Sequence, residues 1–145
     1  MKLILTVGLP RSGKSTWAKG TGFPIVNPDS IRLAVHGQAY REESEPLVWA
    51  MAYMMVRALF LAGNETVVVD ATNVTKKRRD EWKSRFREAS IEFVVFPTTE
   101  EECIRRAIET GREDVIPVIR RQRQDWDFDE PGIRIEDANG RRETP

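Results

Sequence analysis

A glycine-rich loop lies near the amino terminus of the chain. Residues 8–15 read GLPRSGKS, which fits G-x-x-x-x-G-K-[ST], and they follow the apolar run 3–7 directly. Such a loop turns its backbone N–H groups toward a phosphate chain, and the positive end of the following helix adds to the field. Lys14 would reach the β- and γ-phosphates, and Ser15 would hold Mg²⁺. The motif predicts an ATP site formed by Gly8, Arg11, Ser12, Gly13, Lys14, Ser15 and Thr16.

A carboxylate follows the second apolar segment of the chain. Asp29 lies two residues beyond a strand expected at 24–27, where it would face the γ-phosphate and accept the proton of an acceptor hydroxyl. Arg32, one helical turn later, would point the same way and could hold an anionic substrate. By itself Asp29 would be interpreted as a helix N-cap. The phosphate loop favours the catalytic interpretation, because the two features then share one site.

Further polar residues follow the third strand or lie in a polar loop. Asp70 ends the β-branched run 66–70, where an acid can help to hold Mg²⁺, bond the phosphate loop or cap a turn. Thr72 and Asn73 can position Asp29 or the substrate, or cap the next helix. In the loop 37–43, two residues could either contact substrate or have no role in binding, namely Tyr40 and Arg41.

Two groups of basic residues could contact phosphates. Five arginines bracket a predicted helical hairpin at about 98–126, and a lid arginine would stabilise charge on the transferring phosphoryl group: Arg105, Arg106, Arg112, Arg120 and Arg121. A second group gives the helix after the third strand a basic surface: Lys76, Lys77, Arg78, Arg79, Lys83, Arg85 and Arg87. Most such runs are solvated helix faces, and the alternative is contact with a nucleic-acid backbone.

The elements that must position these residues alternate between strand and helix. Apolar or β-branched runs predict strands at 3–7, 24–27, 66–70, 92–96 and, at an edge, 133–136. Periodicity and capping residues predict helices at 15–19, 30–36, 44–63, 75–89, 98–110 and 115–126, and a frayed tail at 137–145. We therefore expect a three-layer α/β fold with a parallel sheet of four to five strands. Ligands of such sheets bind at the carboxyl ends of the strands, where the residues above fall.

Composition restricts the class of protein. The 145 residues suggest one domain, and 40% apolar with 32% charged residues is typical of a soluble globular protein. The 23 basic and 23 acidic side chains cancel, which argues against a broad nucleic-acid coat but leaves room for a local basic groove. The single Cys103 is expected as a buried hydrophobe in a reducing, cytoplasmic setting. The apolar stretch 47–61 is short for a membrane span and contains Arg57.

Taken together, three segments resemble the 5′-hydroxyl polynucleotide kinase domain of phage-type polynucleotide kinases. They are the loop 8–17, the segment NPDSIR at 27–32, and the segment DATN at 70–73 with the pair at 78–79. The resemblance covers most of residues 1–126. It implies an adenylate-kinase-like P-loop NTPase fold and transfer of the ATP γ-phosphate to the 5′-OH end of DNA or RNA. It also implies that Asp29 is the general base and that Arg32 contacts the substrate phosphate.

The lid matches this family least well, so Arg112 and Arg106 are both candidates for its catalytic arginine. We expect residues 1–136 to form the kinase domain and 137–145 a flexible tail. The same motifs occur in P-loop kinases of nucleosides, sugars and antibiotics, so a small-molecule kinase is the main alternative. A nucleotide-binding module that hydrolyses or senses ATP is the third possibility.

Overall fold

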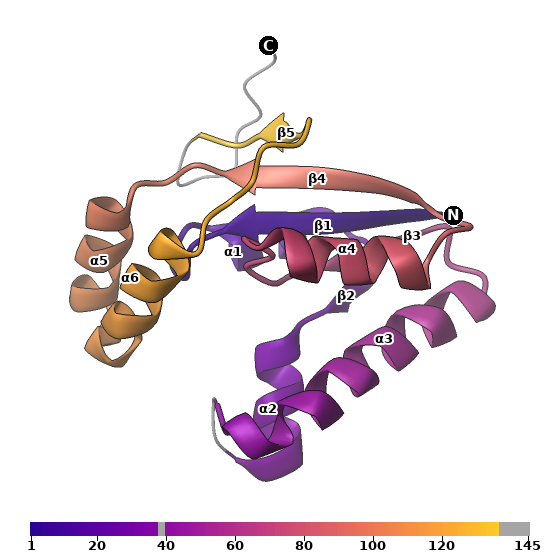
Figure 1. Ribbon diagram of the computed structural model, residues 1–145, viewed down its shortest axis with the longest axis horizontal. Helices are drawn as coiled ribbons and strands as arrows, with labels where there is room; N and C mark the ends of the chain where they lie inside the picture. Colours follow the sequence, from indigo (N-terminus) through magenta and orange to yellow (C-terminus); the bar gives the residue numbers. More distant parts are fainter. Residues whose placement is uncertain (38–39, 137–145) are drawn as a thin grey trace.

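A five-stranded parallel sheet organises the described part of the chain. The computed structural model describes residues 1–37 and 40–136. The sheet has the strand order β2-β3-β1-β4-β5 (Figure 1), built from β1 (Lys2–Gly8), β2 (Ile25–Val26), β3 (Thr66–Val69), β4 (Ser90–Phe96) and β5 (Ile133–Arg134). The predicted α/β fold with a parallel sheet is confirmed. The carboxyl ends of β1, β2 and β3 therefore lie at one edge, together with the loops that follow them.

Helices cover both faces of the sheet, and a helical hairpin extends beyond one end of it (Figure 1). The helices are α1 (Lys14–Gly20), α2 (Pro28–His36), α3 (Glu45–Leu61), α4 (Lys76–Arg85), α5 (Glu100–Glu109) and α6 (Ile116–Gln124). Two 3₁₀ turns, η1 (Glu42–Ser44) and η2 (Glu113–Val115), precede α3 and α6. Helices α5 and α6 pack side by side as the predicted hairpin.

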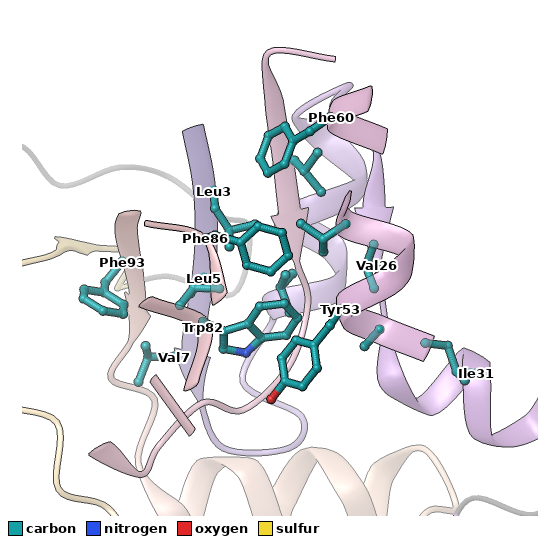
Figure 2. Close-up of a cluster of buried hydrophobic side chains, with 14 of the residues drawn as sticks. Leu3, Leu5, Val7, Val26, Ile31, Tyr53, Phe60, Trp82, Phe86 and Phe93 are labelled. Carbon is teal, nitrogen blue, oxygen red and sulfur yellow. The ribbon is translucent and has the colours of Figure 1, made fainter. Parts of the chain in front are cut away.

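The larger core lies between the sheet and the helices α3 and α4. Leu3, Leu5 and Val7 alternate along β1 and point into this core, which follows from the two-residue period of a strand. Trp82 of α4 is fully buried there and stacks near Phe86, with ring centroids 5.9 Å apart (Figure 2). Trp82 and Phe86 lie four residues apart and are both buried on this side, so their packing fixes α4 on the sheet.

The opposite face of the sheet is covered by α1. Ile4 of β1 points to this side, where it packs with Ala18 of α1. Trp17 meets Phe96 edge to face at 5.9 Å. Since α1 follows the glycine-rich loop directly, this packing anchors the loop to the sheet.

Side-chain caps begin three of the helices, namely α2, α4 and α5, and the cap of α2 is Asn27. Thr75 accepts the backbone N–H of Arg78 at the start of α4, and Thr99 accepts that of Glu102 at the start of α5. Both caps agree with the predicted helix starts. The helix α4 ends at Arg85, four residues before the predicted end, because Phe86 leaves the helical conformation while its ring packs on Phe60. The chain then reaches β4, which begins at Ser90, two residues earlier than expected.

Two further expectations concern the carboxyl-terminal residues 137–145 and the absence of a membrane-spanning helix. The predicted tail at 137–145 lies outside the described residues. Within residues 1–37 and 40–136, no helix combines the length and apolar character that a membrane span requires.

Candidate active site

The glycine-rich loop has the backbone of a phosphate cradle. A Cβ atom at Gly8 would lie 2.6 Å from Ser12 Oγ and 3.0 Å from Phe96 Cβ, so a side chain at this position would displace the loop. Gly13 has φ of 99° and Arg11 has φ of 69°, both in the left-handed region. These conformations turn the loop onto the amino-terminal end of α1, whose first N–H groups have no acceptor within the helix. This arrangement can bind the phosphates of a nucleotide.

Lys14 is buried in the loop and contacts backbone oxygen. Its Nζ donates to the carbonyl oxygen of Leu9 at 2.6 Å and lies 3.4 Å from Ser12 Oγ. Burial lowers the pKa of Lys14 to about 8, although the nearby Asp70 carboxylate opposes the shift. A phosphate chain in the cradle would replace these neutral partners with negative charge, which favours the protonated amine.

This lowered pKa predicts proton uptake on ATP binding. Below pH 8 most Lys14 is protonated before ATP arrives, so little uptake is expected there. Near pH 9 most of the free protein carries a neutral Lys14, and ATP should draw close to one proton onto it. Titration calorimetry in two buffers of different ionisation enthalpy measures this number. Lys14→Arg, which stays charged at pH 9, should abolish the uptake, and equal uptake at pH 7 and pH 9 would contradict the prediction.

A hydrogen-bond network joins the loop to the second and third strands. Ser15 Oγ donates to Asp70 Oδ2 at 2.7 Å, and Asn27 Nδ2 donates to the same oxygen at 3.1 Å. The Oδ1 atom of Asn27 accepts the backbone N–H groups of Asp29 and Ser30, so Asn27 is the N-cap of α2. Asp29 therefore stands in the first turn of α2 and is not its cap. The sequence pattern had not been interpreted as a cap at Asn27, although an Asn followed by Pro is a recognisable helix start.

The pair Ser15 and Asp70 suits a magnesium ion. A hydroxyl and a carboxylate oxygen are the hard donors that Mg²⁺ prefers, and this ion commonly takes one or two protein ligands plus phosphate oxygens and water. In the described part of the chain, no group of three or more His, Cys, Asp or Glu side chains could hold a metal without a nucleotide. The two residues fit a metal that arrives with ATP.

Asp29 and Arg32 form a second polar centre at the start of α2. Arg32 Nη1 lies 2.6 Å from Asp29 Oδ1, and the Arg32 fork donates to both oxygens of Glu45 at 2.7 and 2.9 Å. The Asp29 side chain is 73% exposed, whereas those of Arg32 and Glu45 are largely buried. Burial opposes the charge of Arg32, but Glu45 and Asp29 outweigh it and raise the pKa of the guanidinium. Arg32 is thus held rigidly while Asp29 faces solvent.

The loop after β3 is fastened to the end of β1. Thr6 Oγ1 donates to the carbonyl of Ala71 at 2.7 Å, and Asn73 Nδ2 donates to the carbonyl of Thr6 at 2.9 Å. Asn73 has φ of 44°, and its Oδ1 is buried without a partner among the described residues. Neither Thr72 nor Asn73 caps α4, because Thr75 does. Asn73 shapes this loop, and Thr72 Oγ1 lies 3.4 Å from Gln122 of α6.

An open cleft of about 810 Å³ lies beside Asp29 and Arg32. Its walls come from α2, α3, α4, α6 and the loop after β3, and they combine rings, guanidinium groups and carboxylates. The polar and aromatic residues of its lining are Arg32, Tyr40, Glu42, Glu45, Trp49, Tyr53, Thr72, Asn73, Arg78, Glu81, Arg85, Gln122 and Asp125, together with Thr75. The predicted substrate residues Arg32, Tyr40, Thr72 and Asn73 meet here. Asp70 lies instead at the phosphate loop, and Arg41 pairs with Glu43 away from the cleft lining.

A second hollow of about 330 Å³ lies between the phosphate loop and α5. Arg106 Nη1 donates to the carbonyl of Arg11 at 3.2 Å, and its Nε bonds Glu102. Arg11 in turn donates to Thr110 at 2.8 Å. These bonds latch α5 onto the phosphate loop.

Arg112, the other candidate lid arginine, is placed differently from Arg106. Its side chain is 48% exposed and pairs with Asp114. The pKa of Arg112 is raised by this partner, with a smaller contribution from the charge of Asp29. Arg112 thus lies on the exposed turn before α6, whereas Arg106 is bonded to the phosphate loop.

The basic surface predicted for α4 is only partly present. Arg79 was placed on this surface from the sequence, but it is fully buried, where it bonds Glu130, Asp127 and the carbonyl of Asn73. The reason is that residues 127–130 cover this side of α4. Others of the seven are paired, such as Lys76 with Asp80 and Lys83 with Glu130. Arg85 lines the large cleft.

Cys103 lies in the lid core with Leu9 and Ile119. It is buried at a helical position, as expected. Burial raises the pKa of its thiol to about 11. The thiolate is therefore scarce at neutral pH, and a packing role is favoured.

Comparison with known proteins relates this site to P-loop kinases. A family model described as AAA domain matches residues 3–128. A chain in a Pnkp1/Rnl/Hen1 RNA repair complex superposes with a TM-score of 0.67 at 25% identity, over 88% of this chain and 46% of that chain. A chain in a second structure of the Pnkp1/Rnl/Hen1 complex shares 32% identity with a TM-score of 0.66, over 72% of this chain and 38% of its own. The chain thus spans less than half the length of these two matches.

A gluconokinase from Sinorhizobium meliloti is also similar, with a TM-score of 0.61 at 21% identity over 88% of this chain and 75% of that chain. At this identity the likeness concerns the fold alone. The P-loop kinase fold and the resemblance to a polynucleotide kinase domain are confirmed by these matches. Because the neighbours include kinases of different acceptors, the acceptor must be argued from the cleft.

Proposed function

The chain belongs to the AAA domain family matched over residues 3–128, and from that premise we propose that it is an ATP-dependent 5′-hydroxyl polynucleotide kinase. In the reaction, the oxygen of a 5′-OH end forms a bond to the γ-phosphorus of ATP, and the bond from that phosphorus to the β–γ bridging oxygen breaks. The products are a 5′-phosphorylated strand and ADP. The acceptor proton passes to Asp29.

The residues of the site supply positioning and charge. The loop 8–15 and Lys14 bind the phosphates of ATP, and Mg²⁺ held by Ser15 and Asp70 would neutralise charge on the β- and γ-oxygens. Arg32 is presented beside Asp29 by its two bonds to Glu45, so it can hold the phosphate that follows the terminal nucleoside of the acceptor. When Arg32 binds that phosphate, it would give up its bond to Asp29. The Asp29 carboxylate would then be free to accept the proton.

The observation that carries this proposal is the pairing of Asp29 and Arg32 at the edge of an aromatic cleft. A 5′-OH nucleotide has a hydroxyl, an adjacent phosphate and a flat base. The cleft offers the Arg32 guanidinium, which lies 2.6 Å from the Asp29 carboxylate outside the lining, and the rings of Tyr40, Trp49 and Tyr53. A base can stack on such rings, and phosphate suits a rigid guanidinium fork.

A small-molecule kinase is the second candidate, and one observation favours it. Four carboxylates line the large cleft alongside three guanidinium groups, namely Glu42, Glu45, Glu81 and Asp125 with Arg32, Arg78 and Arg85. A sugar or other neutral polyol would bond carboxylates without charge repulsion. Two of the acids, Glu45 and Glu81, are already bonded to arginines, so the polynucleotide acceptor stays the better supported one.

Transfer of labelled phosphate from γ-labelled ATP with Mg²⁺ tests the proposal. The acceptors are a single-stranded oligonucleotide with a 5′-OH end, its 5′-phosphorylated copy, gluconate and a free nucleoside. Label on the 5′-OH strand, with none on the phosphorylated copy, is the expected result. Label on gluconate or the nucleoside alone would show that the protein is a small-molecule kinase and not a polynucleotide kinase.

A further inference from the structure

Two guanidinium groups lie on the far wall of the cleft, beyond Arg32. Arg78 stands directly over the ring of Trp49, with Cζ 3.5 Å from the ring centroid. Arg85 stands over the ring of Tyr53 at 4.1 Å. Both side chains line the cleft. Stacking on a packed ring holds a guanidinium plane in place, which reduces the entropy lost when it binds an anion.

In the described part of the chain, both guanidinium groups have N–H donors without a protein acceptor. Nη1 of Arg78 donates to Tyr53 Oη at 2.9 Å and to Glu81 at 2.8 Å. Within residues 1–37 and 40–136, Nε and Nη2 of Arg78 have no protein acceptor, and the Arg85 guanidinium has neither an acceptor nor an acidic partner. A guanidinium that is fixed by stacking and keeps N–H groups without an acceptor can bind an anion with several oxygens.

The positions of these groups form a line that leads away from the catalytic end. Arg32 contacts Asp29 and stands over Trp49 at 6.0 Å, and Arg78 covers the same ring. Arg78 and Arg85 are seven residues apart, so they project from one side of α4 at positions separated by about 10.5 Å along its axis. They contact different parts of Tyr53 and can bind two different anionic groups. Guanidinium planes and rings therefore alternate from Arg32 to Arg85.

We propose that Arg78 and Arg85 hold the second and third phosphates of a single-stranded acceptor, so that the shortest substrate that fills the site is a trinucleotide with a 3′-phosphate or a strand of four nucleotides. This inference rests on the proposed polynucleotide kinase function and adds a direction to it. The 5′ end lies at Asp29, and the strand runs along α3 and α4 toward the carboxyl end of α4. Bases stack on guanidinium or ring planes, a mode that tolerates any sequence.

Substitution of Glu81 tests the proposal through an expected gain in affinity for the strand. Its Oε2 accepts both Tyr53 Oη and Arg78 Nη1 at 2.8 Å, so the carboxylate orients the pair while its charge opposes a phosphate. Glu81→Gln keeps an oxygen that can accept these bonds and removes the charge. The substitution should therefore raise affinity for the strand, whereas a structural role alone would lower it or leave it unchanged.

The experiment compares kcat/KM for a nucleoside 3′-monophosphate and for a dinucleotide, a trinucleotide and a ten-residue strand that also carry 3′-phosphates, all with 5′-OH ends and saturating ATP, so that the first three acceptors have one, two and three phosphates. The measured quantity is the trinucleotide-to-mononucleotide ratio within each variant. Arg85→Ala should reduce this ratio about three- to tenfold, as expected for one partly exposed charged contact. It should also lower the slope of log affinity against log salt by about 0.7, the value for one phosphate of a single strand. Glu81→Gln should raise the ratio.

Arg87→Ala is the matched control, because Arg87 is exposed, lies two residues from Arg85 and does not line the cleft. It should leave the ratio as in the unsubstituted protein. Equal effects of Arg85→Ala and Arg87→Ala, or a ratio near one in the unsubstituted protein, would overturn the inference while leaving the kinase function intact.

Failure of the proposed function gives a different pattern. If no acceptor of any length is phosphorylated, fluorescence anisotropy with a labelled trinucleotide that carries both 5′- and 3′-phosphates measures binding directly. Binding that Arg85→Ala weakens and Arg87→Ala spares would support the strand site and reject the kinase function. Absence of binding would overturn both.

Discussion

Asp29→Asn is expected to lower kcat about 10²- to 10⁴-fold, the usual range for loss of a general base. Affinity for ATP should stay within about twofold, because Asp29 is bonded to Arg32 and its charge makes only a minor contribution at Lys14 of the phosphate loop. The fold should persist, since the side chain is 73% exposed and the N-cap of α2 is Asn27. The lost pairing with Arg32 should cost about 0.2–1 kcal/mol at most, as for other exposed ion pairs.

Steady-state kinetics and ATP titration calorimetry on the same preparation check this expectation. Glu43→Gln is a suitable control, because it also removes one exposed carboxylate near the acceptor side but lies outside the cleft lining. Its kcat should change little. An equal loss of ATP binding and of transfer in Asp29→Asn would show that Asp29 is a structural acid and would sink its assignment as the base.

The phosphate loop and the positions of the strands along the chain could be predicted because their signals are local. The apolar run before the loop, the glycines and the following helix lie within about twenty consecutive residues. Their contacts then follow from general features of parallel sheets. Asp29 and Asp70 could be placed near the loop for the same reason, since both follow strands whose carboxyl ends share an edge. Thr75 and Thr99 were recognisable caps because a cap acts on its own helix.

The contacts between distant elements could not be predicted. Glu45 holds Arg32 from thirteen residues along the chain, across the packing of α2 on α3, and no local pattern marks such a partner. Arg79 illustrates the opposite error. An arginine in a basic run was expected on the surface, but Asp127 and Glu130 come from a segment about fifty residues away and bury it.

The aromatic residues of α3 that line the cleft, Trp49 and Tyr53, could not be identified from the sequence for a similar reason. The helix α3 is apolar on nearly every side, so periodicity does not tell which rings face the core and which face the cleft. Trp49 and Tyr53 are one turn apart and could have been assigned to packing alone. The proposed binding surface depends on Arg78 and Arg85 of α4, which stand over these two rings and come from a distant part of the chain.

Arg112→Ala is expected to lower kcat about 10³-fold or more, the effect of removing an arginine that stabilises the transferring phosphoryl group. Arg112 extends from the turn between α5 and α6, and its exposed side chain pairs with Asp114 two residues away. Exchange of this partner for the γ-phosphate costs little, because exposed pairs of this kind are weak. The charge of Asp29 also makes a small contribution to the raised pKa of Arg112.

Arg106→Ala should give a different kinetic pattern. Arg106 is bonded to the carbonyl of Arg11 and to Glu102, so its loss should loosen α5 from the phosphate loop and raise the KM for ATP more than it lowers kcat. Arg105→Ala is the matched control, because Arg105 pairs with Glu102 and Glu109 on the exposed side of α5. A larger fall of kcat in Arg106→Ala than in Arg112→Ala would reverse the assignment. In that case the latch between α5 and the loop would have to open before phosphoryl transfer, since Arg106 cannot bond Arg11 and the γ-phosphate with the same N–H group.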